Sequence, residues 1–191
     1  MKTNKLTLPN KRWKLLKSEV LINNPWLKVR KDCVQLPSGV KIRDYYVSQL
    51  SKVAQVFALT KDKKVIFVKQ YRYPVSKTLL ELPAGIYSPP ETPRSVAKRE
   101  LLEETGYLSK RLKYLGRIVE YPTKNNHEVH LYLAKDVEFT KLANPESTED
   151  IEVVLLPVES ILTLIRKGKI FVGGTISCIL KSLIELQLIN P

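Results

Sequence analysis

Residues 85–107 read GIYSPPETPRSVAKRELLEETGY, and this stretch predicts a short helix with an acidic face. At 3.6 residues per turn, Glu100, Glu103 and Glu104 fall within an arc of about 100°. Like charges at these spacings cost about 0.2–0.5 kcal/mol per pair, and anions in the last turn oppose the helix dipole. The arrangement therefore favours a hard divalent cation over a merely solvated face. Arg99 can orient a carboxylate through its planar guanidinium, although an ordinary surface ion pair fits the spacing equally well.

The ends of this helix are also marked in the sequence. Thr92 is suited to the N-cap and Pro93 to the first helical position. Gly106 can adopt the left-handed conformation that commonly follows the last helical turn. Ala97 and Leu101 point away from the acidic face and are expected to contact a core.

The spacing G-x5-E-x7-R-E-U-x-E-E-x-G-U, in which U is a bulky apolar residue, is identified as the Nudix box. The chain matches every fixed position, with Leu101 and Tyr107 at the U positions. The segments 70–74 (QYRYP) and 81–84 (ELPA), which precede the box, resemble the ADP-ribose and nucleotide-sugar pyrophosphatase branch of that family. Pro122, sixteen residues after the box glycine, lies where that branch commonly has a proline.

This resemblance implies a metal site. Its expected ligands are the carboxylates of Glu100, Glu103 and Glu104 together with the main-chain carbonyl of Ala84. Mg²⁺ is the expected cofactor, with Mn²⁺ as a substitute. Gly85 would let the backbone approach the metal closely, although a simple turn glycine is the alternative.

The resemblance also implies substrate contacts. Arg72 is expected to bind substrate phosphate and Glu81 to approach the terminal ribose, while Gly85 and Pro122 belong to the same binding region. An exposed arginine on an edge strand is the structural alternative for Arg72. After Pro122 many relatives continue with Ser-Pro-Gly, whereas this chain has Thr-Lys-Asn-Asn at 123–126. We therefore expect a different sugar, or several, to be accepted there.

Catalytic roles are assigned partly to the box and partly to a later loop. Within the box, Glu103 and Arg99 are the candidates. The resemblance places a general base on a loop just before a strand of the form E-x-I/V-E-V, and residues 144–153 fit that description. Glu149 matches best and Glu146 is the second candidate. A polar, acidic segment is also what any exposed turn looks like.

Composition limits the other possibilities. The chain has 191 residues and a formal net charge of +13, with its lysines spread along the sequence. Such a charge attracts small polyphosphates as well as nucleic acid, and we consider nucleic acid the less favoured partner. No apolar run approaches the ~20 residues that span a bilayer, and the first residues do not resemble a secretory signal. A cytoplasmic location without membrane contact is the expectation.

The expected fold class is α/β (α+β). Alternation predicts strands in residues 13–50 around a turn at 37–39, and further strands at 52–60, 65–72, 112–121, 128–137 and 150–158. Helices are expected near 158–167 and 174–189. The resemblance implies a Nudix-type α/β/α sandwich around a mixed sheet. It also implies an N-terminal antiparallel β-subdomain, residues 1–50, that helps to form a homodimer, followed by a hydrolase domain over residues 51–191.

These observations predict a Mg²⁺-dependent enzyme that hydrolyses the diphosphate bond of ADP-ribose or a related nucleoside diphosphate sugar. The products would be a nucleoside monophosphate and a sugar phosphate. One alternative is a hydrolase of another polyphosphate, such as a dinucleoside polyphosphate, a dinucleotide cofactor or an RNA cap. The other is a protein that binds ADP-ribose as a sensor without hydrolysing it, which the intact box disfavours.

Overall fold

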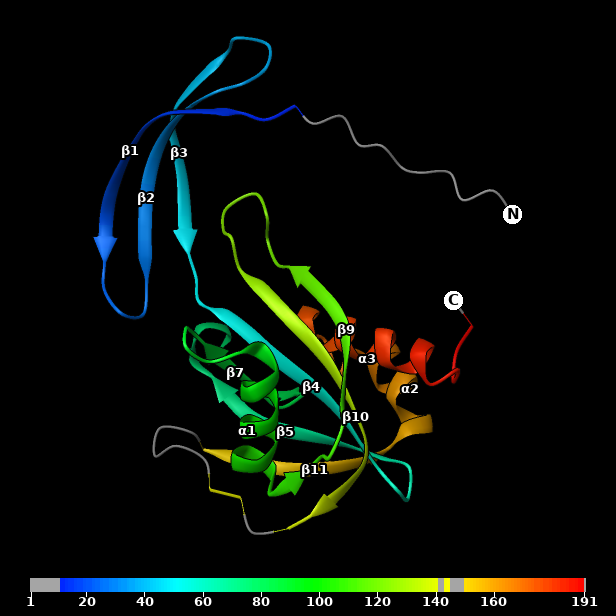
Figure 1. The fold of residues 1–191 in the computed structure, drawn as a ribbon. Coiled ribbons are helices and arrows are strands. Elements are labelled where there is room, and N and C mark those ends of the chain that lie inside the picture. The colour runs from blue at the N-terminus through cyan, green and yellow to red at the C-terminus, as the bar shows by residue number, and fades with distance from the viewer. Residues whose placement is uncertain (1–10, 141–142, 145–149, 191) are drawn as a thin grey trace. The chain divides into compact units, whose positions relative to one another are not determined.

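A computed structural model describes residues 11–140, 143–144 and 150–190, which contain eleven strands and three α-helices (Figure 1). The chain divides into two compact units. One runs to Leu50 and also contains Tyr121–Asn126, and the other comprises Ser51–Glu120 and the chain from His127 onward. No helix in the described residues is long and apolar enough to cross a membrane.

The first unit is a three-stranded antiparallel sheet in the order β1-β2-β3. Its strands are β1 (Lys14–Asn23), β2 (Lys28–Gln35) and β3 (Lys41–Gln49). The hairpin predicted around residues 37–39 is confirmed. Gly39 has a φ of +88°, which is readily adopted by glycine, and its N–H donates to the Leu36 carbonyl at 2.9 Å.

The segment Tyr121–Asn126 is held against the end of β3. The Tyr45 hydroxyl donates to the Thr123 carbonyl at 2.6 Å, and the Ser48 N–H donates to the Lys124 carbonyl at 2.8 Å. The segment that departs from the branch pattern is therefore anchored by hydrogen bonds to the N-terminal sheet. Pro122 belongs to this first unit.

The second unit contains an eight-stranded mixed sheet with the central order β11-β5-β4-β10-β8; β6 also pairs with β5, β7 with β4 and β9 with β10. Strand β4 runs parallel to β10, and the other pairs are antiparallel. The strands are β4 (Lys52–Thr60), β5 (Lys64–Arg72), β6 (Lys77–Glu81), β7 (Ala84–Tyr87), β8 (Tyr107–Leu108), β9 (Leu112–Val119), β10 (Glu128–Phe139) and β11 (Ile151–Pro157).

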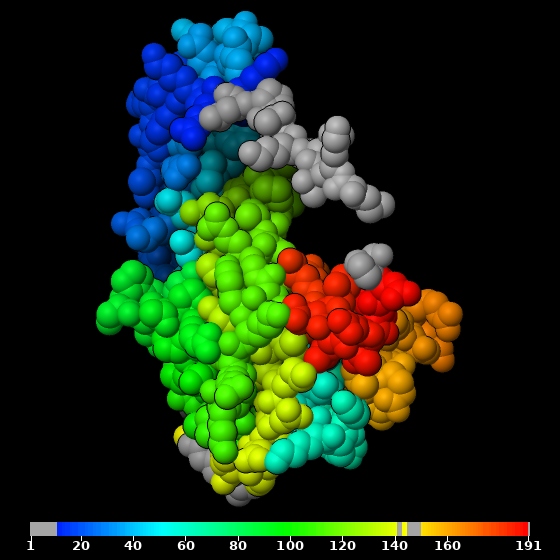
Figure 2. All heavy atoms as spheres, turned by 45° about the vertical axis from the view of Figure 1, so that its right-hand side comes forward, coloured from blue at the N-terminus to red at the C-terminus, as the bar shows by residue number. Residues whose placement is uncertain are grey.

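Helices cover both faces of this sheet. Helix α1 (Pro93–Thr105) packs on one face, and α3 (Gly173–Glu185) packs on the other, as does α2 (Ile161–Arg166) through its buried Ile161. Successive residues of β4 point to opposite faces, so Val56 joins the α1 core and Phe57 joins the α3 core. Figure 2 shows α3 in red beside β9 in green. The predicted α/β/α sandwich around a mixed sheet is confirmed.

The longer strands and all three helices agree with the sequence patterns to within a few residues. The patterns missed three short strands, β6, β7 and β8. Each has five residues or fewer, so alternation has little length in which to become visible. One of them, β7, lies against α1.

Candidate active site

Helix α1 begins and ends where its sequence predicts. The Thr92 hydroxyl accepts the Ser95 N–H at 3.1 Å, and the Ser95 hydroxyl accepts the Thr92 N–H at 3.0 Å, which forms a reciprocal capping box. Pro93 occupies the first turn. Gly106 closes the helix with a φ of +77° and donates its N–H to the Leu102 carbonyl at 2.8 Å.

The acidic face of α1 is partly buried. Val96, Ala97 and Leu101 are fully buried against the sheet, as expected for the apolar face. Glu100 and Glu104 are also buried, with 8% and 4% of their surface exposed. A buried carboxylate is costly unless other groups compensate its charge, so these two positions are occupied at the expense of helix stability.

Strand β7 brings the backbone of Ala84 and Gly85 to these carboxylates. The Ala84 N–H donates to Glu104 Oε2 at 3.2 Å. A Cβ atom at Gly85 would lie 1.9 Å from Glu100 Oε1, a distance that no side chain allows. Gly85 lies in strand β7 and not in a simple turn. Because it has no side chain, the strand backbone can make close contact with Glu100.

Arg99 binds three carboxylates of the box. Its Nη1 lies 2.9 Å from Glu100 Oε1 and 2.9 Å from Glu103 Oε2, and its Nε lies 3.4 Å from Glu91 Oε1. Burial lowers the pKa of Arg99, but the hydrogen bond to Glu103 and the charges of Glu100, Glu103 and Glu91 outweigh this effect, so the pKa is raised. Arg99 is thus a permanent cation that offsets the repulsion among the carboxylates.

Glu91 was not assigned a role from the sequence. It precedes the N-cap of α1 and lies eight residues before Arg99, a spacing that no helical periodicity connects. Its match to the fixed acidic position of the box was the available signal. In the structure it is the third carboxylate partner of Arg99.

The box offers the donor types that suit a hard divalent cation. Two carboxylates, Glu100 and Glu104, are buried beside a strand backbone, and a third, Glu103, is 40% exposed on the same helix. Oxygen donors of this kind fit Mg²⁺ or Mn²⁺. Within residues 11–140, 143–144 and 150–190, however, no three acidic, histidine or cysteine side chains are close enough to share one ion as they stand.

Two residues expected to bind substrate, Arg72 at the end of β5 and Glu81 at the end of β6, form an ion pair. Arg72 Nε donates to Glu81 Oε2 at 2.7 Å, with 46% of the arginine side chain and 13% of the glutamate side chain exposed. Glu81 ends β6, three residues before Ala84. The structure therefore pairs two residues that the sequence treated as separate contacts. Pro122 belongs to the first unit.

The predicted general bases, Glu146 and Glu149, lie outside the described residues. The described residues on either side of them have defined positions. The Asn144 N–H donates to the Glu103 carbonyl at 2.8 Å, and Ile151 pairs with Gln70 of β5. Asn144 is consequently tethered to the last turns of the box helix.

Comparison with known protein families matches most of the chain to two domain models. Residues 50–172 match the model of the NUDIX domain, and residues 13–48 match that of the nucleoside diphosphate sugar hydrolase N-terminal domain. A solved structure described as an ADP compounds hydrolase superposes with a TM-score of 0.79 over 93% of this chain and 96% of the other chain. Its sequence identity is 17%, so this likeness concerns the fold.

Several curated proteins are similar in sequence. A methanol dehydrogenase activator of Bacillus methanolicus is 32% identical over 85% of this chain and 88% of its own length. An ADP-ribose pyrophosphatase of Bacillus subtilis is 30% identical over the same shares, and an ADP-sugar pyrophosphatase of Mus musculus is 30% identical over 85% of this chain and 82% of its own. Together with the intact box, these matches show that the chain belongs to the Nudix family and is a Nudix hydrolase.

Proposed function

We propose that this hydrolase cleaves the diphosphate bond of ADP-ribose or a related nucleoside diphosphate sugar, releasing a nucleoside monophosphate and a sugar phosphate. The observation that carries the proposal is the box itself, in which Glu100 and Glu104 are buried against the Ala84–Gly85 backbone. The family match of residues 13–48 and the relatives that are named ADP-ribose and ADP-sugar pyrophosphatases support this substrate class.

The proposed cofactor is Mg²⁺, with Mn²⁺ as a substitute. When bound, the ion would neutralise the charge of the diphosphate and lower the pKa of a water molecule. The residues that would hold it are Glu100, Glu103, Glu104 and the main-chain oxygen of Ala84. Arg99 orients Glu100 and Glu103 through its paired 2.9 Å contacts.

Arg72 is proposed to bind substrate phosphate, with Glu81 holding it in position. The 2.7 Å bond to Glu81 uses the Nε–H, one of the five N–H donors of the guanidinium. The planar guanidinium is thereby oriented at low entropic cost for a bidentate contact with phosphate oxygens. Glu81 is also proposed to approach the ribose, and Pro122 to take part in substrate binding.

We assign the general base to Glu149, with Glu146 as the alternative. A carboxylate in this role accepts a proton from the attacking water. The hydrogen bond between Asn144 and Glu103 supports the assignment, because it tethers the start of this segment to the helix that carries the proposed metal ligands.

A homodimer formed through the N-terminal sheet is also proposed. All ten residues of β1 are exposed within the chain, although half of them are apolar. Exposed apolar surface of this extent is typical of a protein interface. The large exposed side chains on and beside β1 are Trp13, Leu15, Leu16, Val20, Leu21, Ile22 and Trp26.

The oligomeric state can be tested with a pair of matched variants. Val20 on β1 and Val40 at the β2–β3 turn are exposed to 61% and 58%. We expect Val20→Lys to convert the dimer to monomer in sedimentation analysis and Val40→Lys to leave it intact. A monomeric parent protein, or equal behaviour of the two variants, would contradict the proposed interface.

The function itself is tested by incubating the purified chain with ADP-ribose and a panel of nucleotide sugars in ¹⁸O-water, with Mg²⁺ or with a chelator. We expect turnover only with the divalent cation and ¹⁸O in one product phosphate. Hydrolysis that persists in the chelator would contradict the mechanism. Binding without hydrolysis would favour a sensor. Turnover of only dinucleoside polyphosphates, dinucleotide cofactors or capped RNA would replace the proposed substrate class with that one.

A further inference from the structure

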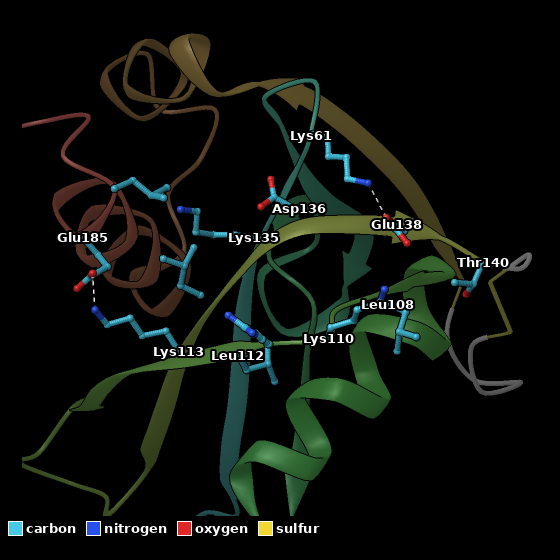
Figure 3. Close-up of a pocket in the computed structure, with 13 residues that line it drawn as sticks. Lys61, Leu108, Lys110, Leu112, Lys113, Lys135, Asp136, Glu138, Thr140 and Glu185 are labelled. Carbon is cyan, nitrogen blue, oxygen red and sulfur yellow. Dashed lines mark hydrogen bonds and ion pairs between the residues drawn. The ribbon is translucent and has the colours of Figure 1, made fainter.

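A cleft lies in the second unit, beyond the C-terminal end of the box helix. It has a volume of about 820 Å³, which is within the usual size range of small-molecule sites. Figure 3 shows that its walls come from the turn after β4, the β8–β9 turn, the end of β10 and the C-terminal end of α3. None of the proposed metal ligands, nor Arg72 or Glu81, lines it.

A β-bulge gives this cleft its charged wall. The register of β10 against β4 shifts between Lys135 and Val137, and the intervening Asp136 has a φ of +52°. Before the bulge, Leu133 points to the α3 face; after it, Val137 points to the α1 face, where regular alternation would not place it. The extra residue therefore leaves Lys135, Asp136 and Glu138 all facing the cleft.

The lining carries an excess of positive charge. Five basic and three acidic side chains line the cleft, for a formal charge of +2. Two of the acids are already paired, Glu138 with Lys61 at 2.6 Å and Glu185 with Lys113. Among the described residues, Lys110, Arg111 and Lys135 form no ion pair or side-chain hydrogen bond, and neither does the carboxylate of Asp136, so the groups left for a ligand are three cations and one anion.

Two of these cations are presented by a fixed turn. Ser109, which is 2% exposed, donates its hydroxyl to the Arg111 carbonyl at 2.7 Å and accepts the Arg111 N–H at 3.3 Å. The backbone that carries Lys110 and Arg111 is thus held before any ligand arrives. Such preorganisation lowers the entropic cost of binding an anion.

Apolar side chains lie between these charges. Leu133 and the half-buried Leu186 line the cleft from the α3 face of the sheet. Leu108 and Leu112 also line it, and Leu112 belongs to the core on the α1 face. An inorganic anion would contact only the cations. A ligand with a flat, weakly polar body and a terminal anionic group would satisfy the leucines and the cations together.

We propose that this cleft is a second ligand site that binds an organic phosphate of mononucleotide size. In this assignment the phosphate contacts Lys110, Arg111 and Lys135, and the ring system lies on Leu133 and Leu186. The proposal does not rest on the substrate assigned to the box, because no residue of that site takes part. The proposal concerns ligand binding, so it is tested by binding measurements and not by turnover.

The test is a titration of the isotope-labelled full chain with AMP, followed by NMR in the presence of a chelator and without added divalent cation. We expect saturable shifts at residues 108–113 and 133–138. Inorganic phosphate at the same ionic strength should bind at least about tenfold more weakly, because it has no ring that could contact the leucines. Equal affinity for the two probes would overturn the proposal, as would shifts confined to α1 and β7.

Matched variants separate this site from general charge effects. Lys110→Gln/Arg111→Gln should weaken AMP binding by about tenfold or more, since hydrogen bonds from charged donors are lost. Arg166→Gln/Lys167→Gln removes the same two charge types elsewhere in the unit and should leave the affinity unchanged. Lys135→Gln, which leaves the turn intact, should also weaken binding. Equal affinities for all four proteins would exclude the site.

Discussion

Helices α1 and α3 are the same length, pack on opposite faces of one sheet and bury six residues each, yet they bury different kinds of side chain. Helix α3 buries Cys178, Ile179 and Leu183 with small and hydroxyl-bearing residues. Helix α1 replaces part of such a surface with Glu100 and Glu104. Helix α3 contributes mainly to packing, whereas α1 has two buried carboxylates at positions where apolar side chains could pack.

The difference leads us to propose α1 as the helix that takes part in the chemistry. Like charges on one face and acids in the last turn both destabilise α1, and no basic residue occupies that turn. Arg99 reduces this cost locally through its three carboxylate contacts. A position that lowers stability is expected to be retained for a ligand, and the comparison predicts that substitutions on α1 change activity and stability in opposite directions.

The largest expected effect is that of Glu104→Gln. Because it removes a proposed metal ligand, turnover should fall at least about 10³-fold, a loss of about 4 kcal/mol of transition-state stabilisation. Without metal, its melting temperature should equal or exceed that of the parent, since a buried charge is removed while the amide oxygen can still accept the Ala84 N–H. Activity assays and thermal melts in chelator measure the two effects.

The exposed Glu159 supplies a matched control, because Glu159→Gln makes the same chemical change away from the box. It should leave both quantities unchanged. If Glu104→Gln keeps activity within tenfold of the parent, or melts well below it, then Glu104 is a structural residue and the contrast between α1 and α3 fails.

The segment that follows Asn144 can sharpen the comparison. Glu149→Gln should lower kcat by about 10²–10⁴-fold and leave KM and metal affinity near the parent values, as expected for loss of a general base. Glu146→Gln shares the segment and the charge change and serves as its control. If Glu146→Gln lowers kcat and Glu149→Gln does not, Glu146 is the general base. If both variants stay active, a residue of the box or a metal-bound hydroxide activates the water.

Two glycines test the close contact between β7 and α1. Gly85→Ala would place a Cβ 1.9 Å from Glu100, and Gly173→Ala at the start of α3 would place one 3.7 Å from Glu120, an ordinary contact. We expect Gly85→Ala to cost about 1–3 kcal/mol of unfolding free energy and about 10²-fold in activity. Gly173→Ala should change the unfolding free energy by less than about 1 kcal/mol. Chemical denaturation of both variants decides the point.

Much of the site could be predicted because its signals are local. The caps of α1 and the spacing of its glutamates lie within 23 residues, and the helix forms as they indicate. The repulsion among the glutamates is equally visible in the sequence. For the same reason the long strands and α3, whose apolar periodicity continues over several turns, were predictable.

The parts that could not be predicted depend on contacts between distant segments. The bond between Arg72 and Glu81 requires the β5–β6 pairing, and the reason for a glycine at 85 requires β7 to lie on Glu100. The basic cleft brings together Lys61, Lys110 and Lys135, which lie far apart in the sequence and gather only in the folded sheet. Lysines spread along the chain therefore gave no sign of it.

The smallest expected effect concerns the interior of the α3 face. Burial raises the pKa of Cys178 to about 12, so at pH 8 about one thiol in 10⁴ would be ionised even if reagent could reach it. Cys33 on β2 is only half-buried. In the folded chain, Ellman's reagent should label Cys178 no faster than the protein unfolds, and in guanidinium it should label both thiols. Cys33→Ser isolates the buried thiol, and rapid labelling of that variant under native conditions would show that α3 does not form the closed, packed face that distinguishes it from α1.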